Sequence, residues 1–150
     1  MNQIKELYQQ LILDHGRNPR NFSKDLQATH IKEGVNPLCG DKLTVYIRAP
    51  HGVVESAMFH GEGCAISMAS ASLMCEALKG KNLQEFDRLF DLFHQLVTSG
   101  SKEACQQLKD SKLLAMKGVF EFPMRVKCAT LVWHATQAAL HLSNDEVTTE

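Results

Sequence analysis

The stretch Asn36-Pro37-Leu38-Cys39-Gly40-Asp41 constrains the fold of this chain more than any other, because it separates two segments with strand-like patterns. A proline and a glycine so close together predict a turn. Cys39 and Asp41 lie two positions apart, so the loop can turn both side chains to the same side. The sequence therefore predicts a loop between two strands that presents a thiol and a carboxylate together.

Three segments have the alternating pattern of short β-strands, at residues 28–35, 43–48 and 53–59. Pro50-His51-Gly52 predicts a tight hairpin turn between the second and the third. Consecutive short strands joined by tight turns favour an antiparallel meander. We therefore expect a small three-stranded antiparallel sheet.

The other periodic segments predict helices at residues 64–78, 83–98 and 124–142, with a weaker helical turn at 102–108. An N-terminal amphipathic helix is predicted by the helical spacing of Ile4, Leu7, Tyr8, Leu11 and Ile12, and residues 14–19 are expected to end it. His15, Arg17 and Arg20 are expected to be solvated. The fold class is thus α+β, with helices packed on one face of the sheet.

Length and composition predict a single domain over residues 1–150, with a polar tail that frays from about residue 144. The balance of 16 basic and 17 acidic residues favours neither nucleic acid nor a membrane surface as partner. The N-terminus lacks the apolar region of a secretory signal. Five cysteines are then interpreted as thiols in a cytoplasmic protein, three in a site and two outside it.

Two further cysteines could join Cys39 and Asp41. Cys64 follows Gly-Glu-Gly at the start of a predicted helix, where free N–H groups favour an anionic sulfur. Cys128 lies early in the last predicted helix. Three thiols and a carboxylate suit zinc or an iron–sulfur cluster. The spacing alone leaves an alternative open, in which these cysteines are small buried core residues.

Three ordered motifs resemble the IscU/SufU family of iron–sulfur cluster assembly proteins, which includes NifU N-terminal-like domains. They are residues 36–41, residues 61–72 around Gly-Glu-Gly-Cys-Ala-Ile-Ser, and residues 122–129 around Phe-Pro-Met-Arg-Val-Lys-Cys. The resemblance runs from about residue 5 to 142 and implies a SufE/IscU-like fold. It implies that Cys39, Asp41, Cys64 and Cys128 are the metal-site residues.

Two features are similar to the SufU branch of the family. Lys127 stands where IscU proteins carry a histidine, and the segment around residues 83–113 is an insertion that IscU proteins lack. This branch implies a zinc-dependent sulfur acceptor that takes persulfide sulfur from a SufS-type cysteine desulfurase and passes it to downstream cluster-assembly proteins. Whether such a sulfurtransferase-like partner counts as an enzyme is left open. The alternative is a scaffold that assembles a [2Fe–2S] cluster, or binds iron, on the same ligands.

We expect Cys39 to be the attacking thiolate, because a loop residue can leave the metal while the other three ligands keep it. Cys75 is interpreted as a core residue and Cys105 as a partly exposed bystander. The histidines His94 and His134 are interpreted as surface or hydrogen-bonded residues. For His60, Arg125 and Lys127 no role is assigned, although Arg125 could hold an anionic sulfur or steady Asp41.

Overall fold

The structure, a computed structural model, describes residues 2–142 and 146–149, with the backbone alone for residues 2–5. Its sheet has the strand order β3-β2-β1-β4. β1 (His30–Asn36), β2 (Asp41–Arg48) and β3 (Ser56–Glu62) form the antiparallel meander that the sequence predicts. The short β4 (Val147–Thr148) adds a parallel edge to β1, so the sheet is mixed and has four strands.

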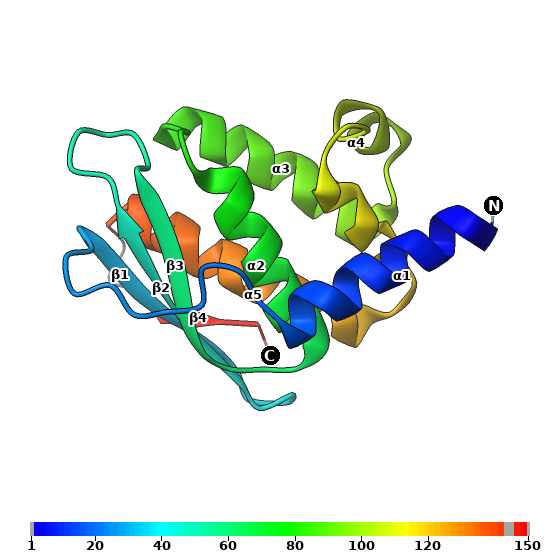
Figure 1. The fold of residues 1–150 in the computed structure, drawn as a ribbon, viewed down its shortest axis with the longest axis horizontal. Helices are drawn as coiled ribbons and strands as arrows, with labels where there is room; N and C mark the ends of the chain where they lie inside the picture. The colour runs from blue at the N-terminus through cyan, green and yellow to red at the C-terminus, as the bar shows by residue number, and fades with distance from the viewer. Residues whose placement is uncertain (1, 143–145, 150) are drawn as a thin grey trace.

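Helices cover one face of this sheet (Figure 1). α1 (Asn2–Arg17) comes first in the chain, and its N-terminal end projects away from the other elements. The later helices are α2 (Ala65–Leu78), α3 (Leu83–Ser99), the short α4 (Lys102–Gln107), the 3-10 helix η1 (Lys112–Glu121) and α5 (Pro123–Leu140). The predicted α+β class is confirmed.

The hairpin between β2 and β3 is wider than the predicted tight turn. Residues 49–52 do turn, with the Gly52 N–H donating to the Ala49 carbonyl, but residues 49–55 all lie between the two strands. Residues 53 and 54 instead pair with the linker between α2 and α3, where the Val54 N–H donates to the Lys81 carbonyl. The backbone N–H and carbonyl of Val54 are thus satisfied outside the hairpin, and the loop need not close as a tight turn.

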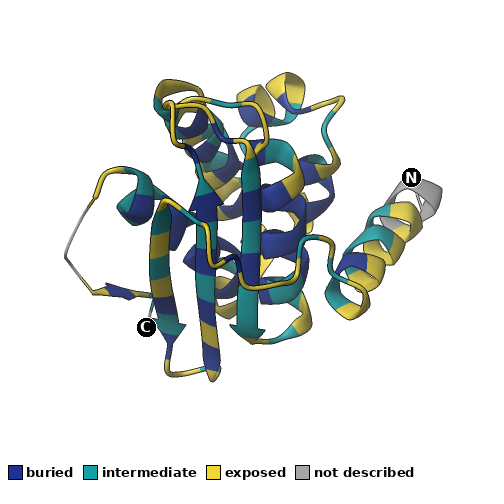
Figure 2. Cartoon of the chain, turned by 60° about the vertical axis from the view of Figure 1, so that its left-hand side comes forward, coloured by how far each residue is buried: buried dark blue, intermediate teal, exposed yellow. Residues whose placement is uncertain are grey.

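The core lies between the sheet and the helices, and Figure 2 shows buried and more exposed residues alternating along the strands. Leu43, Val45 and Ile47 of β2 have no exposed surface. Behind them Trp133 of α5 stacks on Phe93 of α3 with ring centroids 4.3 Å apart. The Trp133 N–H donates to the Ser70 hydroxyl of α2 at 3.0 Å, so the buried indole leaves no donor unpaired.

α1 ends at Arg17, within residues 14–19, where the sequence predicts its end. It continues through Gly16, and a Cβ on Gly16 would lie 3.0 Å from the Ala65 carbonyl oxygen, so glycine permits the close approach to α2. His15, expected in solvent, is only 1% exposed, and its Nδ1 lies 2.7 Å from the Ser72 hydroxyl. The prediction for His15 is wrong because its partner lies 57 positions away in the sequence.

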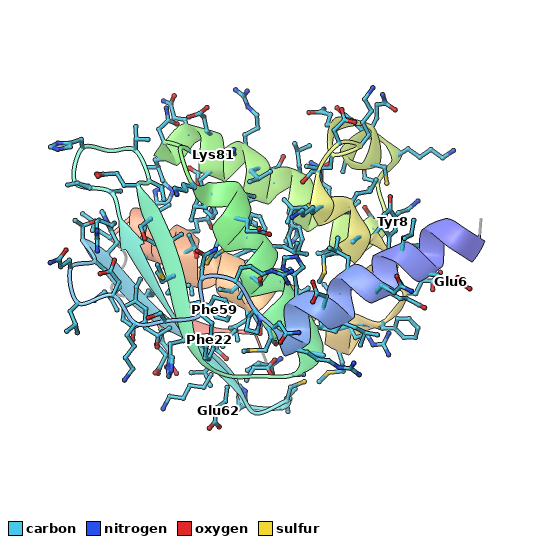
Figure 3. All side chains as sticks on the ribbon, in the orientation of Figure 1. Glu6, Tyr8, Phe22, Phe59, Glu62 and Lys81 are labelled. Atoms are coloured by element: carbon cyan, nitrogen blue, oxygen red, sulfur yellow. The ribbon has the colours of Figure 1, made fainter. Side chains whose placement is uncertain are left out.

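The polar segment after α1 runs beside the free edge of β3. Its Phe22 ring packs edge-on against Phe59 with ring centroids 5.2 Å apart, and it stacks on His60 at 4.8 Å. Phe22 and Phe59 are labelled in Figure 3. The Ser23 N–H donates to the Phe59 carbonyl, and the Phe59 N–H donates to the Asn21 carbonyl. Part of the edge that a short sheet would leave open is therefore covered.

The C-terminal tail contains the short strand β4. Val147 is buried and pairs with Gly34, so the prediction of fraying is wrong for residues 147 and 148. Residues 143–145 and 150 lie outside the described residues. Among the described residues, none of the helices combines the length and apolar character needed to span a bilayer.

Candidate metal centre

The loop of residues 37–40 joins β1 to β2 at one end of the sheet. The Asn36 side-chain oxygen accepts the Leu38 N–H at 3.2 Å, and its carbonyl accepts the Cys39 N–H at 3.2 Å. Gly40 then has a φ of 72°, a left-handed conformation that glycine adopts readily. Asn36 and Asp41 face each other as the last pair of the β1–β2 ladder. The turn chemistry of this motif thus fixes Cys39 beside Asp41.

Asp41 is the first residue of β2 and has no exposed surface. Its carboxylate accepts the Cys64 N–H at 2.9 Å and the Ser67 hydroxyl at 2.5 Å. Within the described part of the chain no lysine or arginine forms a salt bridge with it. Among the described residues this buried carboxylate is therefore hydrogen-bonded but has no cationic partner.

Cys64 caps the N-terminus of α2. Its sulfur accepts the Ser67 N–H at 3.5 Å and lies 4.0 Å from an Asp41 carboxylate oxygen. Just before Cys64, Gly61 lets β3 lie close to β2, because its φ is 140° and a Cβ there would lie 2.1 Å from the Lys42 carbonyl oxygen. The free N–H groups at the start of α2 stabilise negative charge on Cys64.

Cys128 lies in the second turn of α5 and is 4% exposed. The Asn36 side-chain amide donates toward its sulfur at 4.0 Å. Burial raises the pKa of the Cys128 thiol well above its usual range, and hydrogen bonds with Asp41, Cys39 and Cys64 raise it further. Without a cation nearby, this sulfur is therefore a neutral thiol.

All four residues of the predicted site meet at this end of the sheet. Donor atoms of Cys39, Asp41 and Cys128 lie within 4.8 Å of one another, and Cys64 adjoins them through Asp41. Two thiolates on one tetrahedral zinc lie about 3.8 Å apart, so only small side-chain movements separate this arrangement from a coordination shell. Their role as ligands stays a prediction, because proximity alone does not establish binding.

The residues present fit a thiophilic cation. The set contains three thiols and one carboxylate, which are ligands that zinc and iron–sulfur clusters accept. A dication would compensate the charge of Asp41 and favour the thiolate forms of the cysteines. The buried carboxylate without a basic partner is the observation that points to a cation at this position.

Two residues of the centre were not predicted from the sequence. Ser67 joins three of the predicted ligands, through the Asp41 carboxylate, the Cys64 sulfur at 3.4 Å and the Cys128 carbonyl at 3.4 Å. Asn36 shapes the loop and contacts Cys128. Both are polar residues with no exposed surface. Their place inside the ligand motifs was the available signal.

The residues set aside from the centre lie elsewhere. Cys75 is 2% exposed in the core, and Cys105 is half-buried within α4, as predicted. His60 stacks on Phe22. Arg125 is exposed and places its guanidinium 4.3 Å from the centre of the Phe122 ring, so in this structure it steadies neither Asp41 nor a sulfur.

Comparison with known proteins places these motifs in context. The family described as NifU-like N terminal domain matches residues 7–129. The zinc-dependent sulfurtransferase SufU of Bacillus subtilis (strain 168) is 40% identical over 134 residues, which cover 89% of each chain. The iron-sulfur cluster assembly scaffold protein IscU of Streptococcus pyogenes serotype M1 is 34% identical over 143 residues, covering 95% of this chain and 88% of the relative.

A solved structure from Fervidobacterium islandicum AW-1, named as a scaffold candidate for iron–sulfur cluster assembly by the SUF system, has the same fold. Its TM-score is 0.76 at 29% identity, over 87% of this chain and 93% of that one.

Proposed function

The chain belongs to the family of NifU-like N-terminal domains, and from this premise we propose that it is a zinc-dependent sulfur acceptor in iron–sulfur cluster assembly. Its cysteine-rich centre would take persulfide sulfur from a SufS-type cysteine desulfurase and pass it to downstream assembly proteins. The relative named as a zinc-dependent sulfurtransferase supports this choice. Lys127, in place of the histidine of IscU proteins, supports it as well.

Cys39, Asp41, Cys64 and Cys128 would hold the metal. The observation that carries this assignment is the buried Asp41 carboxylate, which is hydrogen-bonded, has no basic partner among the described residues, and lies among three thiols. When bound, zinc would hold the thiols as thiolates near neutral pH and, being redox-inert, would leave their oxidation state unchanged.

Cys39 is the residue that we assign to sulfur transfer. It lies in a turn between exposed neighbours, Leu38 and Gly40, whereas Cys128 is buried and Cys64 is fixed as a helix cap. Its thiolate would attack the outer sulfur of the desulfurase persulfide. A new S–S bond forms on Cys39, the old S–S bond breaks, and the desulfurase cysteine leaves as a thiolate. The exchange balances without an added oxidant or reductant.

Persulfide formation on individual cysteines tests this assignment. After incubation with a cysteine desulfurase and cysteine, the wild-type protein should gain the mass of one sulfur atom at Cys39. Cys39→Ala should lose this gain and should no longer accelerate desulfurase turnover. Cys105→Ala removes a half-buried thiol outside the centre and should behave as the wild type. Undiminished sulfur uptake by Cys39→Ala would show that another residue accepts the sulfur.

A scaffold for a [2Fe–2S] cluster is the second candidate, since several relatives carry the name of IscU scaffold proteins. Three cysteines and an aspartate can also ligate such a cluster. The visible spectrum of the purified protein, together with its zinc and iron content, separates the two. A colourless protein with one zinc supports the sulfur acceptor, and a brown protein with sulfur-to-iron absorption bands supports the scaffold.

Thiols in this number, none of them paired in the described part of the chain, suit a reducing compartment. We therefore propose a cytoplasmic site of action. Fractionation of cells that produce the protein, with a cytoplasmic enzyme as marker, tests this.

A further inference from the structure

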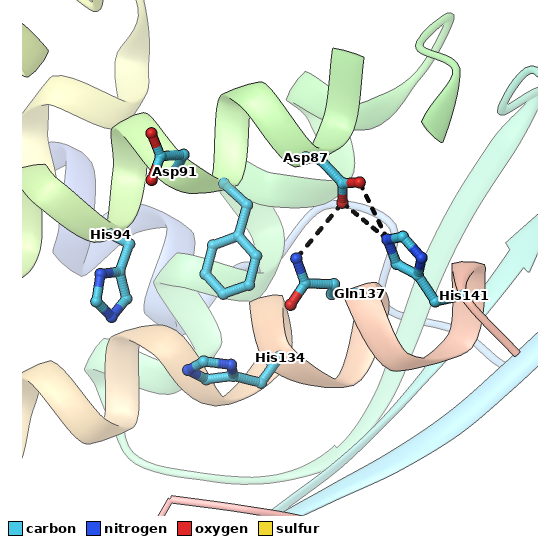
Figure 4. Close-up of a pocket in the computed structure, with 7 residues that line it drawn as sticks. Asp87, Asp91, His94, His134, Gln137 and His141 are labelled. Carbon is cyan, nitrogen blue, oxygen red and sulfur yellow. Dashed lines mark hydrogen bonds and ion pairs between the residues drawn. The ribbon is translucent and has the colours of Figure 1, made fainter. Parts of the chain in front are cut away.

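A second group of metal-ligating side chains lies between α3 and α5, outside the cysteine-rich centre. Asp87, Asp91 and His94 follow one face of α3 at intervals of four and three residues, and His134, Gln137 and His141 follow one face of α5 at intervals of three and four. Residues at such spacings share a helix face. With Phe90, these two rows line an open pocket of about 500 Å³ (Figure 4).

The two ends of this pocket differ. At one end Asp87 is already engaged, because its carboxylate contacts the His141 ring nitrogen at 3.0 Å and accepts the Gln137 amide at 3.4 Å. At the other end the rings of His94 and His134 lie with centroids 6.3 Å apart. Within the described residues, neither of these two rings has a hydrogen-bond partner, so each neutral imidazole can offer one ring nitrogen to a metal ion.

Phe90 holds both imidazoles in place. Its ring lies 6.1 Å from His94 and 5.0 Å from His134, in each case nearly perpendicular to the histidine ring. Two imidazoles on one tetrahedral metal ion have ring centres about 5 Å apart, so the observed separation is close to that of a bound pair. The rings are thus positioned by packing before any ligand arrives.

The charge of the pocket favours a cation. Its lining contains two aspartates and three histidines and no lysine or arginine. Burial, and to a smaller extent the neighbouring His94, lowers the pKa of His134, which keeps this imidazole in the neutral form that ligates metals. Neutral imidazoles with carboxylates bind zinc, nickel and copper in preference to calcium or magnesium.

From this geometry we propose that His94 and His134 bind a divalent transition-metal ion, Zn²⁺ or a close analogue, at a second site on the surface. Asp91, three positions before His94, supplies a carboxylate oxygen after a change of rotamer that gives up its hydrogen bond from the Gln95 amide at 3.0 Å. That change is required, because among the described residues only Cys39, Asp41 and Cys128 have three donor atoms within 4.8 Å of one another. Water completes the shell.

This site is separate from the cysteine-rich centre. Along α5 the six residues from Cys128 to His134 advance about 9 Å and turn the helix by about 240°. The proposal does not depend on sulfur transfer, nor on which metal the cysteines hold. Because it joins two helices that lie 40 positions apart (134−94), an ion bound there would tie the inserted segment of residues 83–113 to α5.

Zinc titration of the tag-free protein, followed through the ring nitrogens of its histidines by NMR, tests the proposal. Zn²⁺ added beyond the metal that the protein retains on purification should shift the His94 and His134 ring signals together and leave His51, an exposed loop histidine, unmoved. The thermal unfolding midpoint should rise with Zn²⁺ and not with Mg²⁺.

Variants separate this site from adventitious binding. The double variant His94→Ala/His134→Ala should lose one equivalent of bound Zn²⁺ relative to the wild type, together with the rise in unfolding midpoint, and should keep the metal of the cysteines. His51→Ala is the matched control and should retain both. The proposal is overturned if the added Zn²⁺ leaves the two ring signals unmoved, or if the double variant binds the additional equivalent as tightly as the wild type.

Discussion

Two buried polar clusters lie along α2, and they differ in whether a charged group in them has a partner of opposite charge. The first joins the start of the helix to Asp41 and Cys128 through Ser67. The second joins its later turns to α1, where the Ser72 hydroxyl lies 2.7 Å from the His15 ring nitrogen and accepts the Arg20 N–H at 2.9 Å. Both have a serine with no exposed surface at their centre.

The difference lies in charge. In the second cluster the other ring nitrogen of His15 lies 3.8 Å from a Glu76 carboxylate oxygen, so the imidazole has a partner at either side. In the first, the Asp41 carboxylate has hydrogen-bond donors but no cation among the described residues. A closed cluster holds two helices together, whereas an open one retains a charge that a ligand can neutralise. Buried polar groups on one helix thus serve both helix packing and, as proposed, metal binding.

The largest expected effect comes from comparing two buried cysteines, one a proposed metal ligand and the other a core residue. Cys128→Ala removes a donor from the open cluster and should lower zinc affinity by about 100-fold or more, since affinity depends on the number of thiolate ligands. Cys75→Ala removes a core thiol and should cost about 1 kcal/mol of stability while zinc binding stays normal. Competition with a chromophoric chelator and urea unfolding measure the two quantities. Equal zinc affinity in both variants would show that Cys128 is not a metal ligand.

A smaller effect is expected from two serines one turn apart on α2. Ser67→Ala removes a donor to Asp41 and should weaken zinc binding by about 10-fold, as changes at groups that orient metal ligands do. Ser70→Ala removes the acceptor of the Trp133 N–H and the donor to the Ala129 carbonyl. It should cost about 1–3 kcal/mol of stability and leave zinc affinity unchanged. If Ser70→Ala weakened zinc binding as much as Ser67→Ala, the open cluster would not be a separate unit.

Local signals made the helices of this chain predictable. α3 begins with a capping box of Asn82 and Glu85 and ends at Gly100 with a φ of 63°, within a residue or two of the predicted bounds. Pro123 marks the start of α5, and Cys64 caps α2. The four residues of the proposed metal centre lie in short motifs next to turns and caps, and the resemblance of these motifs to a family singled them out; their role as ligands stays a prediction.

Features that depend on distant partners could not be predicted. β4 has only two residues, and it forms because Val147 pairs with Gly34 of β1. A strand this short has no periodic pattern from which it could be predicted. The 3-10 helix η1 lacks the 3.6-residue period. The burial of His15 depends on Ser72, and the role of Ser67 on Asp41. Local patterns carry no information on such pairs when only one sequence is read.

The smallest effect concerns the closed cluster and its dependence on pH. Burial lowers the pKa of His15, the nearby Arg20 and Lys112 lower it further, and Glu76 and Asp14 oppose them. Below about pH 6.5 the unfolded chain therefore binds a proton that the folded chain does not, and stability falls until the lowered pKa is reached. Above that range both states are neutral at this residue and the contribution is constant.

His15→Gln keeps a polar side chain at this position and removes its titration, so it isolates the effect. The urea midpoint of the wild type should fall more between about pH 7.5 and about pH 5 than that of His15→Gln. His134, whose pKa burial also lowers, titrates in both proteins and cancels in the difference. A difference between the two midpoints that stays constant over this range would mean that His15 accepts its proton without loosening α1. The second cluster would then tolerate charge, and the contrast with the open cluster around Asp41 would lie in its thiols alone.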